Sequence, residues 1–258
     1  TPPGEIAVSA WAFADQRNGL VFTNSFGSAA SGLVTTHDGG RTWKQAQLPP
    51  ALSDGSIVYI APARGDVVFW NSTPSAKAGF PSAGALFVSS DFGQSWQPLP
   101  APPGFGSMSF SDAETGWLVT HTSVGVQSLF RTTDAGVTWQ ETGLNGRGDF
   151  WTSVTMPVAD PASGELLLAV SRRTQTKDSS IEFYFSDDDG ATWYLTKRLM
   201  PGAPEVSVTN LVVTQGVVVA DIARWGLARR VAGGDWAIST PVSPLRLDYG
   251  KAASGDVM

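Results

Sequence analysis

The stretch Thr36-His37-Asp38-Gly39-Gly40-Arg41-Thr42-Trp43 is the first of four copies of one pattern in this chain. The other copies are Ser89–Trp96, Thr132–Trp139 and Ser186–Trp193, and all four follow S/T-x-D-x-G-x-S/T-W. Four matches to an eight-residue pattern lie far beyond chance. The chain is therefore built from an internal repeat, and the length of that repeat points to its architecture.

The spacing between the tryptophans that end the copies gives the length of the repeat. The steps are 53, 43 and 54 residues between Trp43, Trp96, Trp139 and Trp193. A further step of 43 residues leads to Trp236, which ends a degenerate fifth copy that keeps Gly233 but has Val231 in place of the Asp. A repeat of this length with four strands is typical of the blade of a β-propeller.

The stretches between these copies have the pattern of strands and turns. Apolar or alternating runs of about 5–8 residues are separated by clusters of Gly, Pro, Asn, Asp and Ser, and helical periodicity is nearly absent. We predict an all-β fold, a single β-propeller domain of four-stranded antiparallel blades over residues 1–258. The predicted blades span about residues 5–48, 54–100, 105–144, 150–199 and 205–240.

Residues 241–258 contain what resembles the opening of a sixth blade. Leu245-Arg246-Leu247-Asp248 and Ala253–Met258 are similar to Ser109–Asp112 of blade 3 and Pro161–Leu166 of blade 4. We expect either a fragment of a longer propeller or a five-blade ring with an irregular tail. The first residues, Thr1-Pro2-Pro3, fit a mature form, a trimmed form or a fragment.

The amino-acid composition excludes several classes of function. The net charge is −6, and no Lys/Arg run is longer than a pair such as Arg172-Arg173, so a nucleic-acid partner is not expected. The chain has no Cys, which excludes disulfides, thiolate metal sites and Cys nucleophiles. No apolar run approaches the about 18–20 residues needed to cross a membrane. We expect neither a metal nor another cofactor.

The repeated stretch has a local structural role. Its Asp should accept hydrogen bonds from backbone N–H groups of its own turn, and its Gly should supply a backbone conformation that a Cβ would penalise. The hydroxyls should tie the hairpin ends together, and the Trp should lie in the apolar layer between blades. The structural residues are Asp38, Trp43, Asp91, Trp96, Asp134, Trp139, Asp188, Trp193 and Trp236.

These residues match the Asp-box, or BNR repeat, of β-propellers. A second pattern, F-x-D-x-x-x-G-[WL], begins at Phe13 and at Phe110, and it resembles the subfamily typified by photosystem II assembly and stability factors. Sortilin-type propellers have similar boxes. The resemblance implies a secreted or cell-envelope binding or scaffolding protein. It also implies that the boxes lie on the face opposite the usual ligand site.

The resemblance also admits an enzyme. Asp-box sialidases need three arginines, a Tyr nucleophile with a Glu base, and an Asp acid. No R-I-P-type motif opens blade 1, and none of Tyr59, Tyr184, Tyr194 and Tyr249 is paired with a Glu at a predicted inner-strand position. Other hydrolases of this architecture use two carboxylates. The acids expected on the face opposite the boxes are Asp54, Asp149, Asp178 and Glu205.

One set of residues on that face is the candidate ligand site. Aromatic side chains with arginines could hold a sugar, a carboxylate or a peptide. The candidates are Arg147, Asp149, Trp151, Arg172, Arg173, Arg224, Trp225 and His121. The alternative is that Trp151 fills the inner-strand layer and that the arginines are solvated. The sequence predicts a non-catalytic propeller with a protein or glycan ligand; the alternative is a glycoside hydrolase of sialidase-like architecture.

Overall fold

The structure is a computed structural model, and it is all-β with five antiparallel sheets in sequence order. It describes residues 6–25, 32–49, 58–63, 67–72, 84–121, 127–144, 151–161, 163–173, 179–200, 206–214, 216–223, 225–231 and 234–239. The predicted fold class of four-stranded antiparallel blades is confirmed. Four sheets have four strands, and the sheet of blade 4 has a short fifth strand, β14. The predicted start of a sixth blade lies outside the described residues.

Each blade is a meander whose successive strands pair. Blade 1 consists of β1 (Ile6–Phe13), β2 (Gly19–Ser25), β3 (Gly32–Thr36) and β4 (Lys44–Ala46). Blade 2 consists of β5 (Val58–Pro62), β6 (Val68–Ser72), β7 (Ala85–Ser89) and β8 (Gln97–Pro98). Blade 3 consists of β9 (Gly106–Phe110), β10 (Gly116–His121), β11 (Gln127–Thr132) and β12 (Gln140–Glu141).

Blades 4 and 5 complete the arc, and blade 4 has a fifth strand. Blade 4 consists of β13 (Trp151–Val154), β14 (Val158–Ala159), β15 (Leu166–Arg173), β16 (Ser179–Ser186) and β17 (Tyr194–Leu199). Blade 5 consists of β18 (Val208–Thr214), β19 (Val217–Ile222), β20 (Gly226–Val231) and β21 (Trp236–Ser239). β13 and β14 both pair with β15, because the first strand of this blade is interrupted at residues 155–157. Pro157 lies in the interruption and has no N–H to donate to the ladder.

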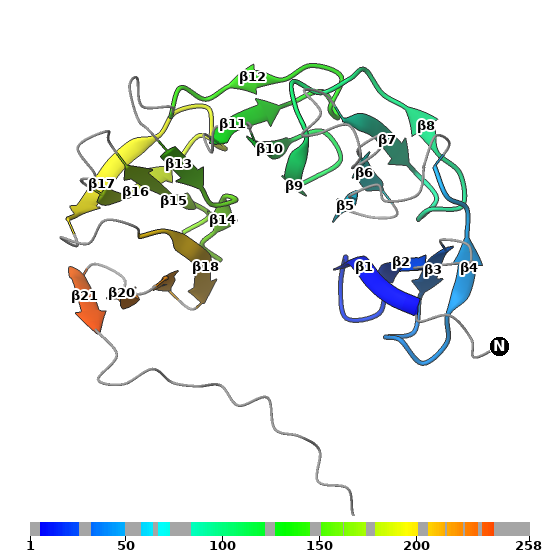
Figure 1. The fold of residues 1–258 in the computed structure, drawn as a ribbon, viewed down its shortest axis with the longest axis horizontal. Helices are drawn as coiled ribbons and strands as arrows, with labels where there is room; N and C mark the ends of the chain where they lie inside the picture. Colours follow the sequence, from blue (N-terminus) through cyan, green and yellow to red (C-terminus); the bar gives the residue numbers. More distant parts are fainter. Residues whose placement is uncertain are drawn as a thin grey trace, which may run out of the picture.

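The five blades form an open arc rather than a closed ring (Figure 1). Neighbouring blades contact one another in chain order: β1 lies against β5, β5 against β9, β11 against β13, and β15 against β18. The first strand of each blade lines the inside of the arc, and the fourth strand lies at its outer rim. A gap separates blade 1 from blade 5 among the described residues.

The four boxes make the hydrogen bonds that the sequence predicted. In blade 1, Oδ1 of Asp38 accepts from the backbone N–H of Thr42 at 2.9 Å, and Oδ2 accepts from the Thr42 hydroxyl at 2.6 Å. The backbone N–H of Gly40 donates to the Thr36 hydroxyl at 2.9 Å. The same three bonds recur around Asp91, Asp134 and Asp188. Each box therefore closes its own turn with hydrogen bonds to its Asp and to its first hydroxyl residue.

These bonds also determine where the fourth strands begin. β4, β8 and β12 begin two residues after Thr42, Ser95 and Thr138, respectively. The backbone N–H of each of these residues donates to the box Asp and so is not available to the strand ladder. The hairpin is closed by the box, and strand pairing starts only after the Trp.

Four apolar clusters hold the arc together, one in each interface between neighbouring blades. In each interface the box of the later blade packs against the earlier blade. A Cβ added to the box glycine would meet Leu20 for Gly93, Leu86 for Gly136 and Trp117 for Gly190. The box tryptophans of blades 2 to 5 are half-buried in these clusters. Trp43 of blade 1 departs from the prediction, because it is 40% exposed.

Candidate functional site

The candidate face is the end of the blades opposite the boxes. The box follows the third strand, so the connection from the second to the third strand lies at the other end of the blade. Trp151 begins β13 and pairs with Arg173, and Thr152 pairs with Arg172, near the end of β15. The structure therefore brings Trp151, Arg172 and Arg173 to the same end of blade 4.

The other predicted ligand residues are more dispersed. His121 ends β10 and pairs with Gln127 at the corresponding end of blade 3. Trp225, between β19 and β20, is half-buried and packs against the apolar cluster of blades 4 and 5. Outside the described residues lie Arg147, Asp149, Arg224, Asp54, Asp178 and Glu205. A ligand-binding role for any of these residues stays a prediction.

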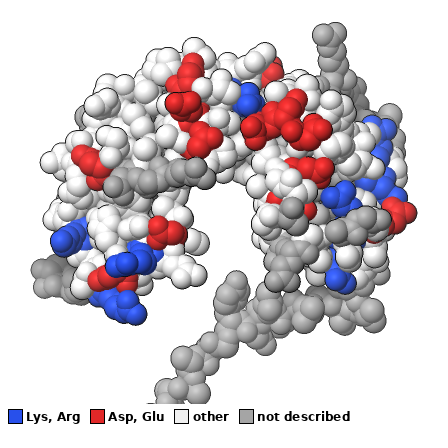
Figure 2. All heavy atoms as spheres, turned by 180° about the vertical axis from the view of Figure 1, so that it is seen from behind, with Lys and Arg blue, Asp and Glu red and all other residues white. Residues whose placement is uncertain are grey.

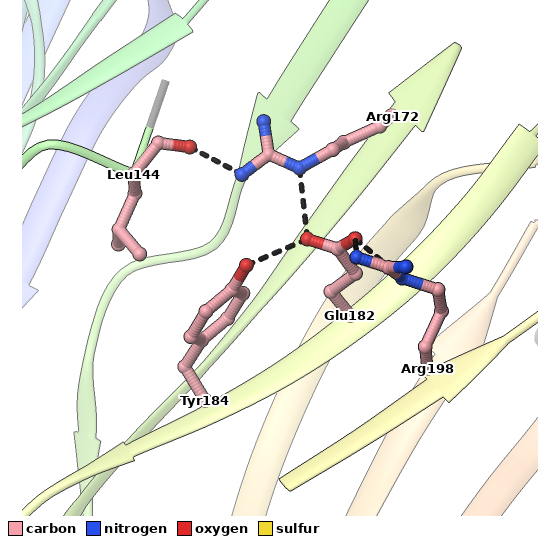
Figure 3. A network of polar contacts seen from close by, with 5 residues as sticks. All are labelled: Leu144, Arg172, Glu182, Tyr184 and Arg198. Carbon is pink, nitrogen blue, oxygen red and sulfur yellow. Dashed lines mark hydrogen bonds and ion pairs between the residues drawn. The ribbon is translucent and has the colours of Figure 1, made fainter. Parts of the chain in front are cut away.

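Arg172 is held by a network of polar contacts around Glu182 (Figure 3). Nε of Arg172 donates to Oε2 of Glu182 at 2.8 Å, and Nη2 donates to the carbonyl oxygen of Leu144. Nε of Arg198 donates to Oε1 at 2.7 Å, and the Tyr184 hydroxyl donates to Oε2 at 2.6 Å. The side chain of Glu182 is 4% exposed, that of Arg172 13% and that of Arg198 55%. We call these contacts the Glu182 network.

The Glu182 network joins two blades. Arg172, Glu182 and Arg198 lie on the adjacent strands β15, β16 and β17. Side chains alternate along β16, so Ile181 and Phe183 enter the apolar cluster toward blade 5, while Glu182 faces blade 3. Leu144, which accepts from Arg172, belongs to the connection that leaves blade 3. The guanidinium of Arg172 therefore ties blade 4 to blade 3.

The network controls the protonation of its acidic groups. Burial raises the pKa of Glu182, but hydrogen bonds from Tyr184 and Arg172 and the charges of Arg172 and Arg198 outweigh burial, so the pKa lies below 4.5. Burial, together with the hydrogen bond to Glu182, raises the pKa of Tyr184 above 10.0. At neutral pH the pair is a carboxylate and a protonated phenol.

Sequence reasoning missed this Tyr–Glu pair. Sialidases use such a pair with arginines, but their pair must face the substrate at the centre of the propeller. Tyr184 and Glu182 lie on β16, the third strand of blade 4, and Glu182 is buried in the interface with blade 3. A raised pKa also makes the phenol a poorer nucleophile. The arrangement fits a structural role, and the sequence signal for it was the alternation of Glu182 and Tyr184 with Ile181, Phe183 and Phe185 along β16.

The inside of the arc carries a cavity of about 400 Å³, which we call the inner cavity. Its wall comes from the first strands of blades 3, 4 and 5, with contributions from β10, β11 and β14. Gln127 lines it at the first residue of β11, at the end opposite the boxes. The lining residues are Ser107, Val119, Gln127, Ser153, Val154, Thr155, Met156, Val158, Val208, Thr209, Asn210 and Leu211.

The inner cavity is polar but uncharged. Four of its lining residues carry hydroxyls, two carry amides and six are aliphatic or Met. Some of the polar groups already have partners: Oε1 of Gln127 accepts from the backbone N–H of Val154 at 2.8 Å, and the Thr209 hydroxyl donates to Asp221 at 3.0 Å. Asn210 is exposed at the bulge of β18. The cavity offers hydrogen bonds and apolar contact, and none of its lining residues is a carboxylate.

Charged side chains are distributed unevenly over the surface of the arc (Figure 2). On the face shown in Figure 2, acidic side chains gather over the middle of the arc, and most basic ones lie toward its two ends. In the part of the chain that the structure describes, no three His, Cys, Asp or Glu residues are grouped so that they could hold a metal ion. No helix within the described ranges has the length and apolarity to cross a membrane.

No protein-family model and no curated protein matches the sequence. Among solved structures, the GH74 xyloglucanase of Xanthomonas campestris is 17% identical, with a TM-score of 0.60 over 91% of this chain and 38% of that one. The α-L-arabinofuranosidase Arb93A of Fusarium graminearum is 14% identical, with a TM-score of 0.50 over 90% and 80%. YCF48 bound to a D1 peptide is 19% identical, with a TM-score of 0.45 over 92% and 83%.

The first two likenesses support the fold, which is structurally similar to propellers of the Asp-box type. At under 25% identity they leave activity open, and this chain spans 38% of the length of the xyloglucanase. A TM-score of 0.45 is too low to support a function shared with YCF48. Because one fold can carry unrelated activities, the function depends on the site.

Proposed function

We propose that this chain is a non-catalytic binding propeller whose inner cavity receives an uncharged segment of a ligand. The observation that carries the proposal is the composition of that cavity: hydroxyls, amides and aliphatic side chains from three blades, with no acidic residue among them. Glycoside hydrolysis needs two carboxylates about 5–10 Å apart across the substrate. A neutral, partly apolar wall supplies binding without the groups that cleave a glycosidic bond.

A polypeptide fits the inner cavity better than a glycan. Sugar rings are commonly held by an aromatic side chain against their apolar face, and no aromatic residue lines the cavity. Extended peptides instead need backbone hydrogen-bond partners and small apolar pockets, which Ser153, Asn210 and Met156 supply together. We therefore place a protein ligand first and a glycan second.

An extracytoplasmic location completes the proposal. Its support is the resemblance of the boxes and of the turn that follows Phe13 to a subfamily that works mainly outside the cytoplasm. Fractionation of cells that express the native gene tests it directly. Recovery of the protein in the envelope or medium would support the proposal, and recovery in the cytoplasm would contradict it.

Binding is tested with an array of unstructured peptides and neutral oligosaccharides, followed by titration calorimetry of the best ligand. Met156→Trp fills the inner cavity, and Asn210→Arg places a cation at its exposed rim. Met156→Trp takes up space that the ligand needs, and Asn210→Arg places an unpaired charge next to an uncharged ligand segment. Each variant should therefore weaken binding at least about tenfold. Gln94→Arg adds the same charge at an exposed box position and is the matched control.

The outcomes separate the two classes of function. Loss of peptide binding in both cavity variants, with the control unchanged, supports the proposal. Peptide binding that survives both variants would remove the inner cavity as the site. Release of reducing sugar from xyloglucan or arabinan by the wild-type protein would favour the hydrolase alternative.

A further inference from the structure

Backbone groups of two inner strands form part of the wall of the inner cavity. The lining includes four consecutive residues of blade 4, residues 153–156, and four of blade 5, residues 208–211. Side chains alternate between the two faces of a strand, so a strand that presented one face would contribute only every second residue. Both segments therefore meet the cavity with an edge, and the N–H and C=O groups of that edge border it.

In blade 4 the N–H group of this edge is already bound within the protein. The N–H of Thr155 donates to the carbonyl oxygen of Ala169 in β15 at 2.9 Å, so the preceding residue, Val154, points its N–H and C=O away from β15. The N–H of Val154 donates to Oε1 of Gln127 in blade 3 at 2.8 Å. The carbonyl oxygen of Val154 is then the acceptor that the edge of β13 offers to the cavity.

Side chains of the preceding blade bind the inner strands of two other blades in the same way. The N–H of Val208, on the edge of β18 that lines the cavity, donates to the Ser171 hydroxyl of blade 4 at 2.9 Å. At blade 3 the direction is reversed, since Nδ2 of Asn71 donates to the carbonyl oxygen of Gly106 at 3.3 Å. On the two edges that border the cavity, the bound group is the N–H donor.

Thr155 supplies a donor next to the Val154 acceptor. Its hydroxyl oxygen accepts from the backbone N–H of Ala169 at 2.9 Å, directly after the end of β13. A hydroxyl that accepts one hydrogen bond still has its own O–H to donate. Val154 and Thr155 both line the inner cavity, so a carbonyl acceptor and a hydroxyl donor lie on consecutive residues of its wall.

We propose that Val154 and Thr155 bind a primary carboxamide, the side chain of an Asn or Gln in the ligand. A primary amide carries an N–H and a C=O side by side, whereas in a trans backbone peptide these two groups point in opposite directions. A carboxylate has acceptors only, and an ammonium group would bury its charge in a cavity that no acidic residue lines. This assignment rests on the proposed function, the binding of an uncharged polypeptide segment, and names the side chain that the segment inserts.

Four short Gly/Ser peptides with different central residues test this assignment. They carry Gln, Met, Glu or Lys at the centre and are blocked by an acetyl group and an N-methylamide, so that only the Gln peptide has a primary amide. NMR titration of the isotope-labelled protein measures each Kd and shows whether the signal of Val154 responds. The Gln peptide should bind at least about tenfold more tightly than each of the others, and Met156→Trp should abolish its binding.

Gln127 is a positioning residue, because it acts on the ligand through the N–H of Val154. Gln127→Met removes the acceptor of that N–H, which then offers a donor to a ligand carboxylate. The preference for the Gln peptide over the Glu peptide should fall at least about threefold. Gln140→Met, at an exposed position of β12, is the matched control, and thermal melting verifies that both variants fold. A purely structural role of Gln127 would weaken all four peptides equally and leave the preference unchanged.

The outcomes separate this assignment from the proposed function. Equal affinities of the four peptides, a tighter Lys or Glu peptide, or a preference for Gln that Gln127→Met leaves unchanged overturns the carboxamide assignment. The proposed function survives these results where Met156→Trp still abolishes binding. The assignment alone also fails if none of the four binds at about 1 mM while another peptide binds and is lost in the cavity variants. If no peptide binds in the inner cavity, both are overturned.

Discussion

Replacing Glu182 by Gln should destabilise the protein through the interface of blades 3 and 4. The substitution keeps the size of the side chain and one carbonyl acceptor but removes the negative charge. In the Glu182 network Arg172 then has only uncharged acceptors, the remaining amide oxygen and the carbonyl oxygen of Leu144, while its side chain remains 13% exposed. Arg198 is 55% exposed, so water can solvate its charge. The loss of folding stability therefore comes mainly from the buried ion pair of Arg172 and Glu182.

The structure sets the expected size of this effect. Removing one partner of a buried ion pair typically costs about 3–5 kcal/mol, whereas an exposed pair contributes about 0–1 kcal/mol. The Arg172 pair belongs to the first kind and the Arg198 pair to the second. We expect a loss of about 3 kcal/mol at neutral pH, toward the lower end because Leu144 still accepts from Arg172. In a chain of this size, that corresponds to a melting temperature lower by roughly 6–12 °C.

Urea unfolding followed by tryptophan fluorescence measures this loss, with Glu114→Gln at an exposed turn as the control. The double variant Glu182→Met/Arg172→Met should regain most of the stability, because apolar side chains of similar length need no charge partner. The reasoning is refuted if Glu182→Gln lies within about 0.5 kcal/mol of wild type, or if the double variant is less stable than the single one.

The pH dependence gives the same experiment a second readout. The pKa of Glu182 in the folded protein lies below the ordinary value of 4.5. Its contribution is therefore fully present above about pH 4.5 and is lost as the pH falls through the folded pKa. Gln does not titrate, so the difference between wild type and Glu182→Gln should be largest at neutral pH and shrink below pH 4.5. A difference that grows on acidification would contradict the assigned charge state.

Two further predictions concern the boxes. Gly190→Ala should destabilise more than Gly164→Ala: both have positive φ, at 79° and 77°, but only at Gly190 would the Cβ collide with Trp117, at 2.7 Å. Equal melting temperatures would contradict this. Side-chain and backbone hydrogen bonds from Thr192 lower the pKa of Asp188 to about 2, so its stabilising effect is present above pH 3.8 and lost as the pH falls toward 2. In an NMR titration, Thr192→Val should raise that pKa toward 3.8.

The sequence was most informative where one short segment determines its own structure. The Asp38 box is a closed set of hydrogen bonds within eight residues, so its pattern predicts the turn and the residues that form it. The same is true after Phe13, where Oδ1 of Asp15 accepts from the backbone N–H of Asn18 at 2.9 Å. Phe13 then covers Gly19, where a Cβ would lie 2.4 Å from the ring. Because the box recurs four times along the chain, these local patterns together predicted the propeller fold.

The site could not be predicted in the same way, because its parts are far apart in sequence. The inner cavity needs Ser107, Ser153 and Asn210 from three blades, and no local pattern relates them. The burial of Trp43 also depends on a neighbour, so the box predicted a buried Trp that the open end of the arc leaves exposed. Local patterns determine each blade, whereas the contacts between blades depend on how the arc is assembled.

The Glu182 network also bears on which ligands the candidate face can bind. The sequence made Arg172 one of several candidates for holding a sugar, a carboxylate or a peptide, but Oε2 of Glu182, a carboxylate of the chain itself, lies 2.8 Å from Nε of that guanidinium. A ligand anion would have to displace Glu182 and leave it buried without its partner, which costs more than the new pair would return. Because Arg172 is already neutralised inside the fold, the proposed recognition depends on uncharged groups. This is why the neutral inner cavity, rather than Arg172, carries the proposed function.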